Sequence, residues 1–350
     1  MLSSNRRKGA TLRTAGTILT AVGLVILAGC NGAEKTEQVG LSLEEGKELL
    51  SVDFQEGRTL RYRFVSSRDI SIDWSSMAAG SKRTERGENN VDRLSESLEM
   101  VVAYTPVKVE PYGLTVIEAT CKSVKVTRSQ SGDRKASKDA VESLRGKSFT
   151  FTVRPNGKIE DHSQLDELIK EIGKEAFREH SRQGRVKEPD MIGDVVASQW
   201  FLWDSISSIE RPFEGVSVGE SWKSKLSVPT PMVMREARDV TYTLGEIRQT
   251  GKGRIAVIRS SYLPSESVPS GWPVPYTGRF HRSGPFGLLG YYQMLDLQGE
   301  GEELFNIDAG RIEEYSQRYR LEVSSSLIFR LPGVNPKITV EQQLRMLLMD

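Results

Sequence analysis

Apolar and polar residues alternate along several long stretches of this chain, and this period of two constrains the fold more than any other feature. Between residues 58 and 65, Leu60, Tyr62 and Phe64 alternate with arginines. Successive side chains of a strand point to opposite faces, so this run predicts a strand with one apolar and one solvated face. The other predicted strands cover residues 97–109, 113–127, 148–153, 299–307, 311–331 and 338–348.

Two stretches show the spacing of helices instead. From Ser163 to Gln183, and again from Asp190 to Ile209, apolar residues recur at steps of three and four. Residues 338–348 also fit a helix, but alternation there favours a strand. Because an amphipathic helix needs a surface to cover, the predicted class is α+β, a mainly antiparallel β-sheet with packed helices.

Short segments of the first part of the chain recur in the same order in the second part. Val102-Ala103-Tyr104-Thr105 is followed later by Val240-Thr241-Tyr242-Thr243, and Asn156-Gly157-Lys158-Ile159 by Ala309-Gly310-Arg311-Ile312. The order suggests two related sheet-plus-helix halves, residues 51–210 and 211–350. The alternative explanation is that these segments are alike only because β-hairpins resemble one another in composition.

The N-terminal segment has the layout of an export signal. Four cationic residues precede an apolar run from Ala15 to Ala28, which ends in Leu27-Ala28-Gly29-Cys30. This ending resembles a bacterial lipobox, which implies removal of residues 1–29 and lipidation of Cys30. A transmembrane helix is the alternative, but spanning takes about 20 apolar residues and this run is shorter.

The lipobox resemblance also predicts where the protein is located. Residues 30–50 become a lipidated cysteine and tether that attach the protein to a membrane in the cell envelope. Asn31 is not the aspartate that retains such proteins in the inner membrane. The resemblance therefore favours the periplasmic side of the outer membrane.

Charge and cysteine content exclude some classes of partner and crosslink. Loss of residues 1–29 would change the formal net charge from +1 to −3, which does not favour nucleic-acid binding. Once Cys30 is lipidated, Cys121 is left without an intrachain disulfide partner. Its alternating neighbours predict a buried strand position for the thiol.

Aromatic residues mark two candidate contact regions for an apolar ligand or an envelope partner. Residues 263–290 combine five prolines with aromatic residues, as binding loops do, although a strand-capping excursion is the alternative. An aromatic patch on the second predicted helix is the other region, where core packing is the alternative. The candidate residues are Trp272, Tyr276, Phe280 and Phe286 in the loop, and Trp200 and Trp203 on the helix.

Residues for catalysis or metal binding are not evident in this sequence. His162, His180 and His281 have no second ligand at metal-binding spacing, so no metal site and no cofactor are predicted. Gly-x-Ser-x-Gly, His-Glu-x-x-His and phosphate-binding glycine motifs are missing. Catalytic residues therefore stay unknown, and a role other than enzyme is favoured.

The order of features resembles a family of uncharacterised exported bacterial lipoproteins, a domain of unknown function with a Gly-Asp/Glu-x-Trp motif. Gly219-Glu220-Ser221-Trp222 follows Pro212-Phe213, and Asp308-Ala309-Gly310-Arg311 precedes the last strands. Family members often have Asp where this chain has Glu220. The resemblance covers residues 50–350 and implies an antiparallel β fold with packed helices and no established activity.

Two hypotheses for function follow. In the first, a lipid-anchored envelope lipoprotein binds an apolar ligand or an envelope protein without catalysis. In the second, it is an envelope hydrolase whose active site consists of acidic residues.

Overall fold

The computed structural model describes residues 46–78, 90–130, 139–179, 186–187, 191–232, 234–268, 280–281, 286, 288–327 and 335–349. The chain divides into two compact units, Met1–Ser42 and Leu43–Asp350, and all described residues belong to the second. Cys30 and the predicted signal segment lie outside the described residues. No helix among the described residues is long and apolar enough to cross a membrane.

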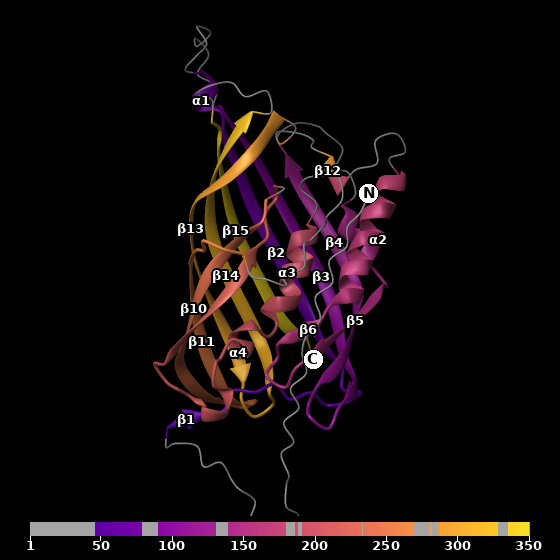
Figure 1. Cartoon of the computed structure of the whole chain (residues 1–350), viewed down its shortest axis with the longest axis vertical. Helices are drawn as coiled ribbons and strands as arrows, with labels where there is room; N and C mark the ends of the chain where they lie inside the picture. The colour runs from indigo at the N-terminus through magenta and orange to yellow at the C-terminus, as the bar shows by residue number, and fades with distance from the viewer. Residues whose placement is uncertain are drawn as a thin grey trace, which may run out of the picture. The chain divides into compact units, whose positions relative to one another are not determined.

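One antiparallel sheet of eleven strands dominates this unit, in the order β6-β5-β4-β3-β2-β15-β14-β13-β11-β10-β9 (Figure 1). The earlier strands are β2 (Leu60–Asp73), β3 (Val91–Val109), β4 (Thr115–Gln130), β5 (Ser148–Val153) and β6 (Ile159–Asp161). The later strands are β9 (Ser221–Val228), β10 (Glu236–Thr250), β11 (Gly253–Pro264), β13 (Leu289–Asn306), β14 (Arg311–Leu327) and β15 (Lys337–Met349).

The first and last strands of this sheet along the chain, β2 and β15, lie side by side in its middle. From β2 the chain proceeds outward to β6, crosses to the opposite edge at β9, and returns inward to β15. β15 then pairs with β2, from Lys337 opposite Asp73 to Met349 opposite Arg61. The first and last long strands are therefore neighbours, and this pairing joins the two parts of the chain into one sheet.

The crossing segment contains most of the helical structure. It comprises α2 (Ser163–Glu179), α3 (Ile192–Phe201), α4 (Asp204–Ser207) and the short η2 turn (Pro212–Glu214). Two-residue strands flank the sheet: β1 (Lys47–Glu48) pairs with β8 (Val216–Ser217), and β7 (Val186–Lys187) with β12 (Phe280–His281). α1 (Ser75–Ala78) and η1 (Ala140–Leu144) are two further short helical elements.

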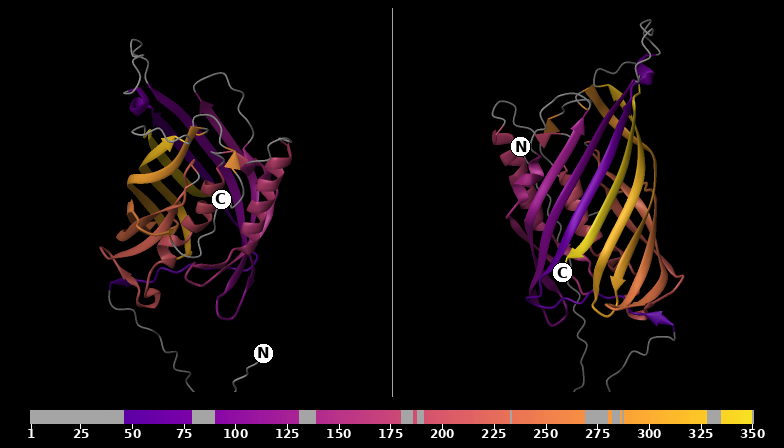
Figure 2. Two further views of the ribbon diagram at one scale, coloured as in Figure 1. Left: turned by 45° about the horizontal axis from the view of Figure 1, so that its top comes forward. Right: turned by 180° about the vertical axis from the view of Figure 1, so that it is seen from behind.

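The core lies between the concave face of the sheet and α3 and α4, which we call the crossover helices. The sheet curls around them, as the left view of Figure 2 shows. Along β2, Tyr62 and Phe64 face this core and are at most 2% exposed, whereas the arginines between them face solvent. Eight of the ten residues of α3 are buried, so this helix is enclosed on nearly all sides.

The predicted α+β class is wrong, because the protein is a sheet-dominated, mainly antiparallel β structure. Every described α-helical residue lies between Ser75 and Ser207, so the later strands β9–β15 carry no α-helix of their own among the described residues. The two helical patterns in the sequence were correct locally. They belong to one crossing segment and form no helical layer on each half, because the long strands align into a single sheet.

Several local predictions are confirmed. Helix α2 begins at Ser163 as predicted, and the C-terminal segment is a strand. Cys121 is a buried strand residue at 4% exposure, and burial raises the pKa of its thiol to about 11. The predicted halves 51–210 and 211–350 supply β2–β6 and β9–β15 of the same sheet, and their origin by duplication stays a prediction.

Candidate functional site

Two groups of buried polar residues lie beneath the crossover helices. The first, the Arg68 cluster, consists of Arg68, Glu96, Arg128, Asp139 and Asp194. The second, the Arg238 cluster, consists of Arg238, Gln317 and the rings of Phe201, Tyr262 and Tyr319. Both central arginines are at most 1% exposed.

Arg68 on β2 is neutralised by carboxylates from two directions. Its Nε donates to Glu96 Oε2 at 2.5 Å, and Glu96 is its direct partner on β3. Its Nη1 donates to Asp194 Oδ2 at 2.9 Å, from the first turn of α3. Hydrogen-bonded opposite charges are the condition under which a buried arginine is tolerated. The pair therefore attaches α3 to the sheet.

The Arg68 cluster continues to the start of the helical segment. Arg128 Nε on β4 donates to Glu96 Oε1 at 2.7 Å, and Arg128 also pairs with Asp139. Asp139 accepts hydrogen bonds from the backbone N–H groups of Val141 and Met191, at 2.9 and 3.1 Å. Burial raises the pKa of Asp139 despite the opposing effect of Arg128. The cluster thus connects three strands with η1 and α3.

Gln342 on β15 connects the two clusters. Its Nε2 donates to Ser66 Oγ at 2.9 Å and also to Asp194. Its Oε1 accepts a hydrogen bond from Tyr319 OH at 2.8 Å. The ring of Tyr319 belongs to the second cluster, so polar contacts run across the concave face from β3 to β10.

Arg238 on β10 has aromatic neighbours where Arg68 has carboxylates. Its guanidinium carbon lies 4.1 Å from the ring centroid of Tyr262 and 5.2 Å from those of Phe201 and Tyr319. Its Nη2 donates to Gln317 Oε1 at 2.5 Å. Its Nε and Nη1, and Gln317 Nε2, have no hydrogen-bond partner among the residues that the structure describes. Aromatic faces attract the cation but supply no oxygen acceptor for these N–H groups.

Two glycines of β13 make this arrangement possible. A Cβ on Gly301 would lie 2.4 Å from Tyr262 OH, and one on Gly299 would lie 2.8 Å from Tyr262 Cδ2. The Tyr262 ring therefore lies against bare strand backbone. From there its hydroxyl contacts Ser260 Oγ at 2.8 Å and Tyr315 OH at 3.3 Å.

A third set of contacts attaches α4 to the sheet. Asp204 accepts hydrogen bonds from Tyr242 OH at 2.7 Å and Ser224 Oγ at 3.0 Å. Ser205 Oγ donates to Glu303 Oε1 at 2.6 Å, whereas Glu303 Oε2 has no partner. Burial raises the pKa of Asp204 to about 6 and that of Glu303 to about 8. Near neutral pH, Asp204 is therefore mainly ionised and Glu303 mainly protonated.

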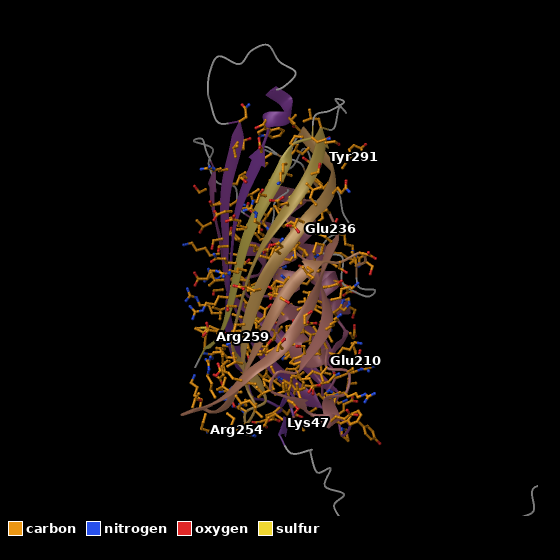
Figure 3. All side chains as sticks on the ribbon, turned by 90° about the vertical axis from the view of Figure 1, so that its left-hand side faces the viewer. Lys47, Glu210, Glu236, Arg254, Arg259 and Tyr291 are labelled. Carbon is orange, nitrogen blue, oxygen red and sulfur yellow. The ribbon has the colours of Figure 1, made fainter. Side chains whose placement is uncertain are left out.

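The outer face of the sheet carries a different feature, an open hollow of about 850 Å³. Its charged lining comes from β2, β11, β13, β14 and β15, and Arg259 is labelled in Figure 3. Most of its arginines already form ion pairs, such as Arg63 with Glu99 and Arg345 with Glu314. Such exposed pairs are typical of a solvated sheet face.

The aromatic residues predicted as contacts do not share one surface among the described residues. Trp203 is 8% exposed and packs against Phe151, with ring centroids 5.5 Å apart. Trp200 is partly buried against the core, and Phe286 is 1% exposed. Trp272, Tyr276 and the side chain of Phe280 lie outside the described residues. Their role in binding stays a prediction, whereas the alternative of core packing is confirmed for Trp203.

Neither central arginine was predicted from the sequence. A signal for them existed, because each occupies an apolar-face position of its strand. Arg68 is in phase with Phe64 and Ile70, and Arg238 is in phase with Val240 and Tyr242. A charged residue at such a position predicts a buried charge, but which residue pairs with it depends on strand order and helix placement.

Comparisons with known proteins leave the activity open. No curated protein matches the sequence. The fold is similar to a solved structure titled "Lipid-protein interactions in lipovitellin", at 10% identity and a TM-score of 0.42. That match covers 85% of this chain and 26% of the other, so the chain spans about a quarter of its length. Residues 113–257, which include the crossover helices and Arg238, are similar to DUF6263, a family of unknown function.

Proposed function

We propose that the protein is a lipid-anchored envelope protein whose folded part binds an apolar ligand on the concave face of its sheet, without catalysis. The anchor rests on the lipobox-like segment ending in Cys30. By the same resemblance, the location is the periplasmic side of the outer membrane. The ligand site rests on the structure of the crossover helices.

One observation supports the ligand site most directly: the concave face is covered by a short apolar segment. The buried surface of α3 includes Val195, Val196 and Phe201. Hydrophobic burial is non-directional, so an apolar chain of similar area can replace such a helix on the sheet. The sheet keeps its own hydrogen bonds during this exchange, because its strands pair with one another.

The contacts that hold the crossover helices are concentrated at a few polar points. Asp194 holds the start of α3, whereas Asp204 and Ser205 hold α4. Between them, Phe201 stacks on Tyr315 with ring centroids 6.0 Å apart, and Gln199 Oε1 accepts a hydrogen bond from Tyr104 OH at 2.6 Å. Displacement of the middle of this segment therefore breaks the Tyr104–Gln199 hydrogen bond, and the contacts of Asp194 and α4 can stay in place.

Hydrolysis is the alternative, and Asp204 and Glu303 are the pair that would favour it, because their pKa values are separated. However, Glu303 is 1% exposed and bonded to Ser205 beneath α4. This hydrogen bond holds α4 on the sheet, which accounts for Glu303 without a role in catalysis. The geometry therefore supports binding over catalysis.

Hydrogen exchange tests the ligand site. The polypeptide from residue 31 onward is delipidated and titrated with a long-chain fatty acid methyl ester. We expect saturable binding, faster amide exchange in α3 and unchanged exchange in β2 and β15. Absence of binding, or binding that leaves the exchange of α3 unaltered, argues against the proposal.

Membrane fractionation tests the anchor. Replacing Cys30 with Ser removes the thiol that the lipid would modify, so we expect loss of labelled fatty acid and release by carbonate washing. Cys121→Ser is the matched control, because that thiol is buried, and it should leave anchoring unchanged. A Cys30→Ser protein that stays membrane-bound after washing would contradict the anchor.

A further inference from the structure

We propose that Arg238 and Gln317 form the headgroup site of the ligand, and that the ligand is an amphiphile carrying a single carboxylate. This inference rests on the proposed function, because the apolar chain of the ligand would occupy the surface that α3 leaves. It specifies the chemical class of the ligand's headgroup, which the apolar surface alone does not indicate.

The first argument is the set of hydrogen-bond donors without partners. Arg238 Nε and Nη1 and Gln317 Nε2 are buried and unpartnered, and they belong to two side chains already joined by a hydrogen bond. Arg238 is 0% exposed and Gln317 is 4% exposed. Leaving a buried polar group without a partner costs about 1–3 kcal/mol, and more when it is charged. Donors arranged in this way fit an oxygen-rich group.

The second argument is the charge. Arg238 forms no salt bridge with any residue that the structure describes, so its charge is offset by aromatic rings and by the more distant Asp204. A carboxylate supplies one negative charge and two acceptor oxygens, which matches one guanidinium and the neighbouring amide. A phosphate monoester carries up to two charges at neutral pH, and this cluster has only one arginine.

The third argument is the position of Phe201. This residue ends α3, lies over the guanidinium of Arg238 and stacks on Tyr315. Displacement of the C-terminal end of α3 removes the ring that covers the donors and vacates apolar surface in the same movement, while Asp194 keeps the start of the helix bound to Arg68. Headgroup and chain sites thus become available together.

The test compares an acid with its ester. The delipidated polypeptide from residue 31 onward is titrated with a dansyl-labelled undecanoic acid and with the methyl ester of the same probe. We expect the wild-type protein to bind the acid at least tenfold more tightly. Arg238→Met should abolish this preference, because it removes the cation that the carboxylate of the acid would pair with. Gln317→Leu should reduce the preference less, because it removes only an amide donor.

Two further variants separate a headgroup role from a structural one. Arg238→Lys keeps the charge but has no planar guanidinium, so it should keep part of the acid preference. Arg63→Met removes an exposed arginine of the outer face and should leave both affinities unchanged. Thermal unfolding of each variant shows that it is folded before binding is compared.

The possible results separate this inference from the proposed function. Equal affinity for acid and ester, or a preference that survives Arg238→Met, overturns the carboxylate site while the apolar site stands. Binding of neither probe overturns the proposed function. In a competition experiment, dodecyl phosphate and dodecanoate each displace the bound acid probe. If the phosphate is at least tenfold more effective, the carboxylate assignment is overturned and the donors are assigned to a phosphate headgroup.

Discussion

The two buried arginines of the concave face have opposite environments. Arg68, in the earlier strands, is hydrogen-bonded to Glu96 and Asp194. Arg238, in the later strands, contacts three aromatic rings and one amide, and two of its nitrogens lack partners. Fold stability accounts for the first arrangement, because a paired charge holds α3 on the sheet. It does not account for the second, in which an unpaired charge is kept inside the core.

The comparison predicts that the two regions respond differently to substitution. In the Arg68 cluster, removing any charged residue leaves another charge buried in an apolar environment without its partner. In the Arg238 cluster, the partner is already missing, so removing the charge relieves a cost. Four substitutions test this difference, from the largest expected effect to the smallest.

Asp194→Ala should have the largest effect. It removes the carboxylate that accepts from Arg68, Ser66 and Gln342. Breaking one side of a buried ion pair costs about 3–5 kcal/mol, measured as the free energy of unfolding in urea. The exposed pair Arg63–Glu99 is the control, and Glu99→Gln should cost less than about 1 kcal/mol. Equal effects of the two substitutions would show that burial does not matter at Asp194.

Gly301→Ala should destabilise the protein by about 1–3 kcal/mol, because overpacking forces the Tyr262 ring away from the strand. The added Cβ would lie 2.4 Å from Tyr262 OH and 2.6 Å from Ser260 Oγ. Gly251→Ala is the control, since a Cβ there meets nothing within 4 Å. If both variants unfold at the same urea concentration as the wild type, close contact between the Tyr262 ring and β13 does not contribute to stability.

Glu303→Gln should change how stability depends on pH. The folded-state pKa of Glu303, about 8, lies above the ordinary value of 4.5, so the folded state holds the proton more tightly. Ionising this group therefore costs stability as pH rises from about 4.5 to 8. The glutamine cannot ionise, so the stability of the variant relative to wild type should rise steadily from pH 4 to pH 8.

Thermal unfolding between pH 4 and 9 measures this dependence. Glu302→Gln, at an exposed neighbouring position of β13, is the control and should shift both ends of the curve equally. Parallel curves for wild type and Glu303→Gln would contradict a protonated Glu303.

Arg238→Met should have the smallest effect on stability, a change within about 1 kcal/mol or a slight gain. Methionine fills only part of the space between the rings, but it needs no partner, so removal of the unpaired charge offsets the loss of packing and of the contacts between the cation and the rings. Arg68→Met provides the comparison, because it leaves Glu96 and Asp194 without their shared cation and should cost several times more. A loss of 3 kcal/mol or more from Arg238→Met would make both arginines structural and weaken the case for a headgroup site.

Particular residues show how far the sequence predicts this fold. Alternation in β2 correctly assigned Tyr62 and Phe64 to one face, because the period of a strand is a local property. The helical spacing after Ser163 and after Asp190 was equally local and equally informative. The number of sheets, in contrast, depends on contacts between residues that are far apart in the sequence. The α+β prediction failed because the described α-helices all lie between Ser75 and Ser207, and nothing near Lys337 in the sequence indicates that β15 pairs with β2 to form a single large sheet.

In the candidate site, too, some features follow from the local sequence and others from the tertiary structure. The phase of Arg68 and Arg238 with apolar neighbours is a local property of the sequence, although neither residue was predicted to be part of a site. Only the tertiary structure decided that Arg68 meets Glu96 and Asp194 and that Arg238 meets aromatic rings. The physical reason is that pairing of a buried charge depends on side chains from distant strands and from α3, and strand order and helix placement bring these together.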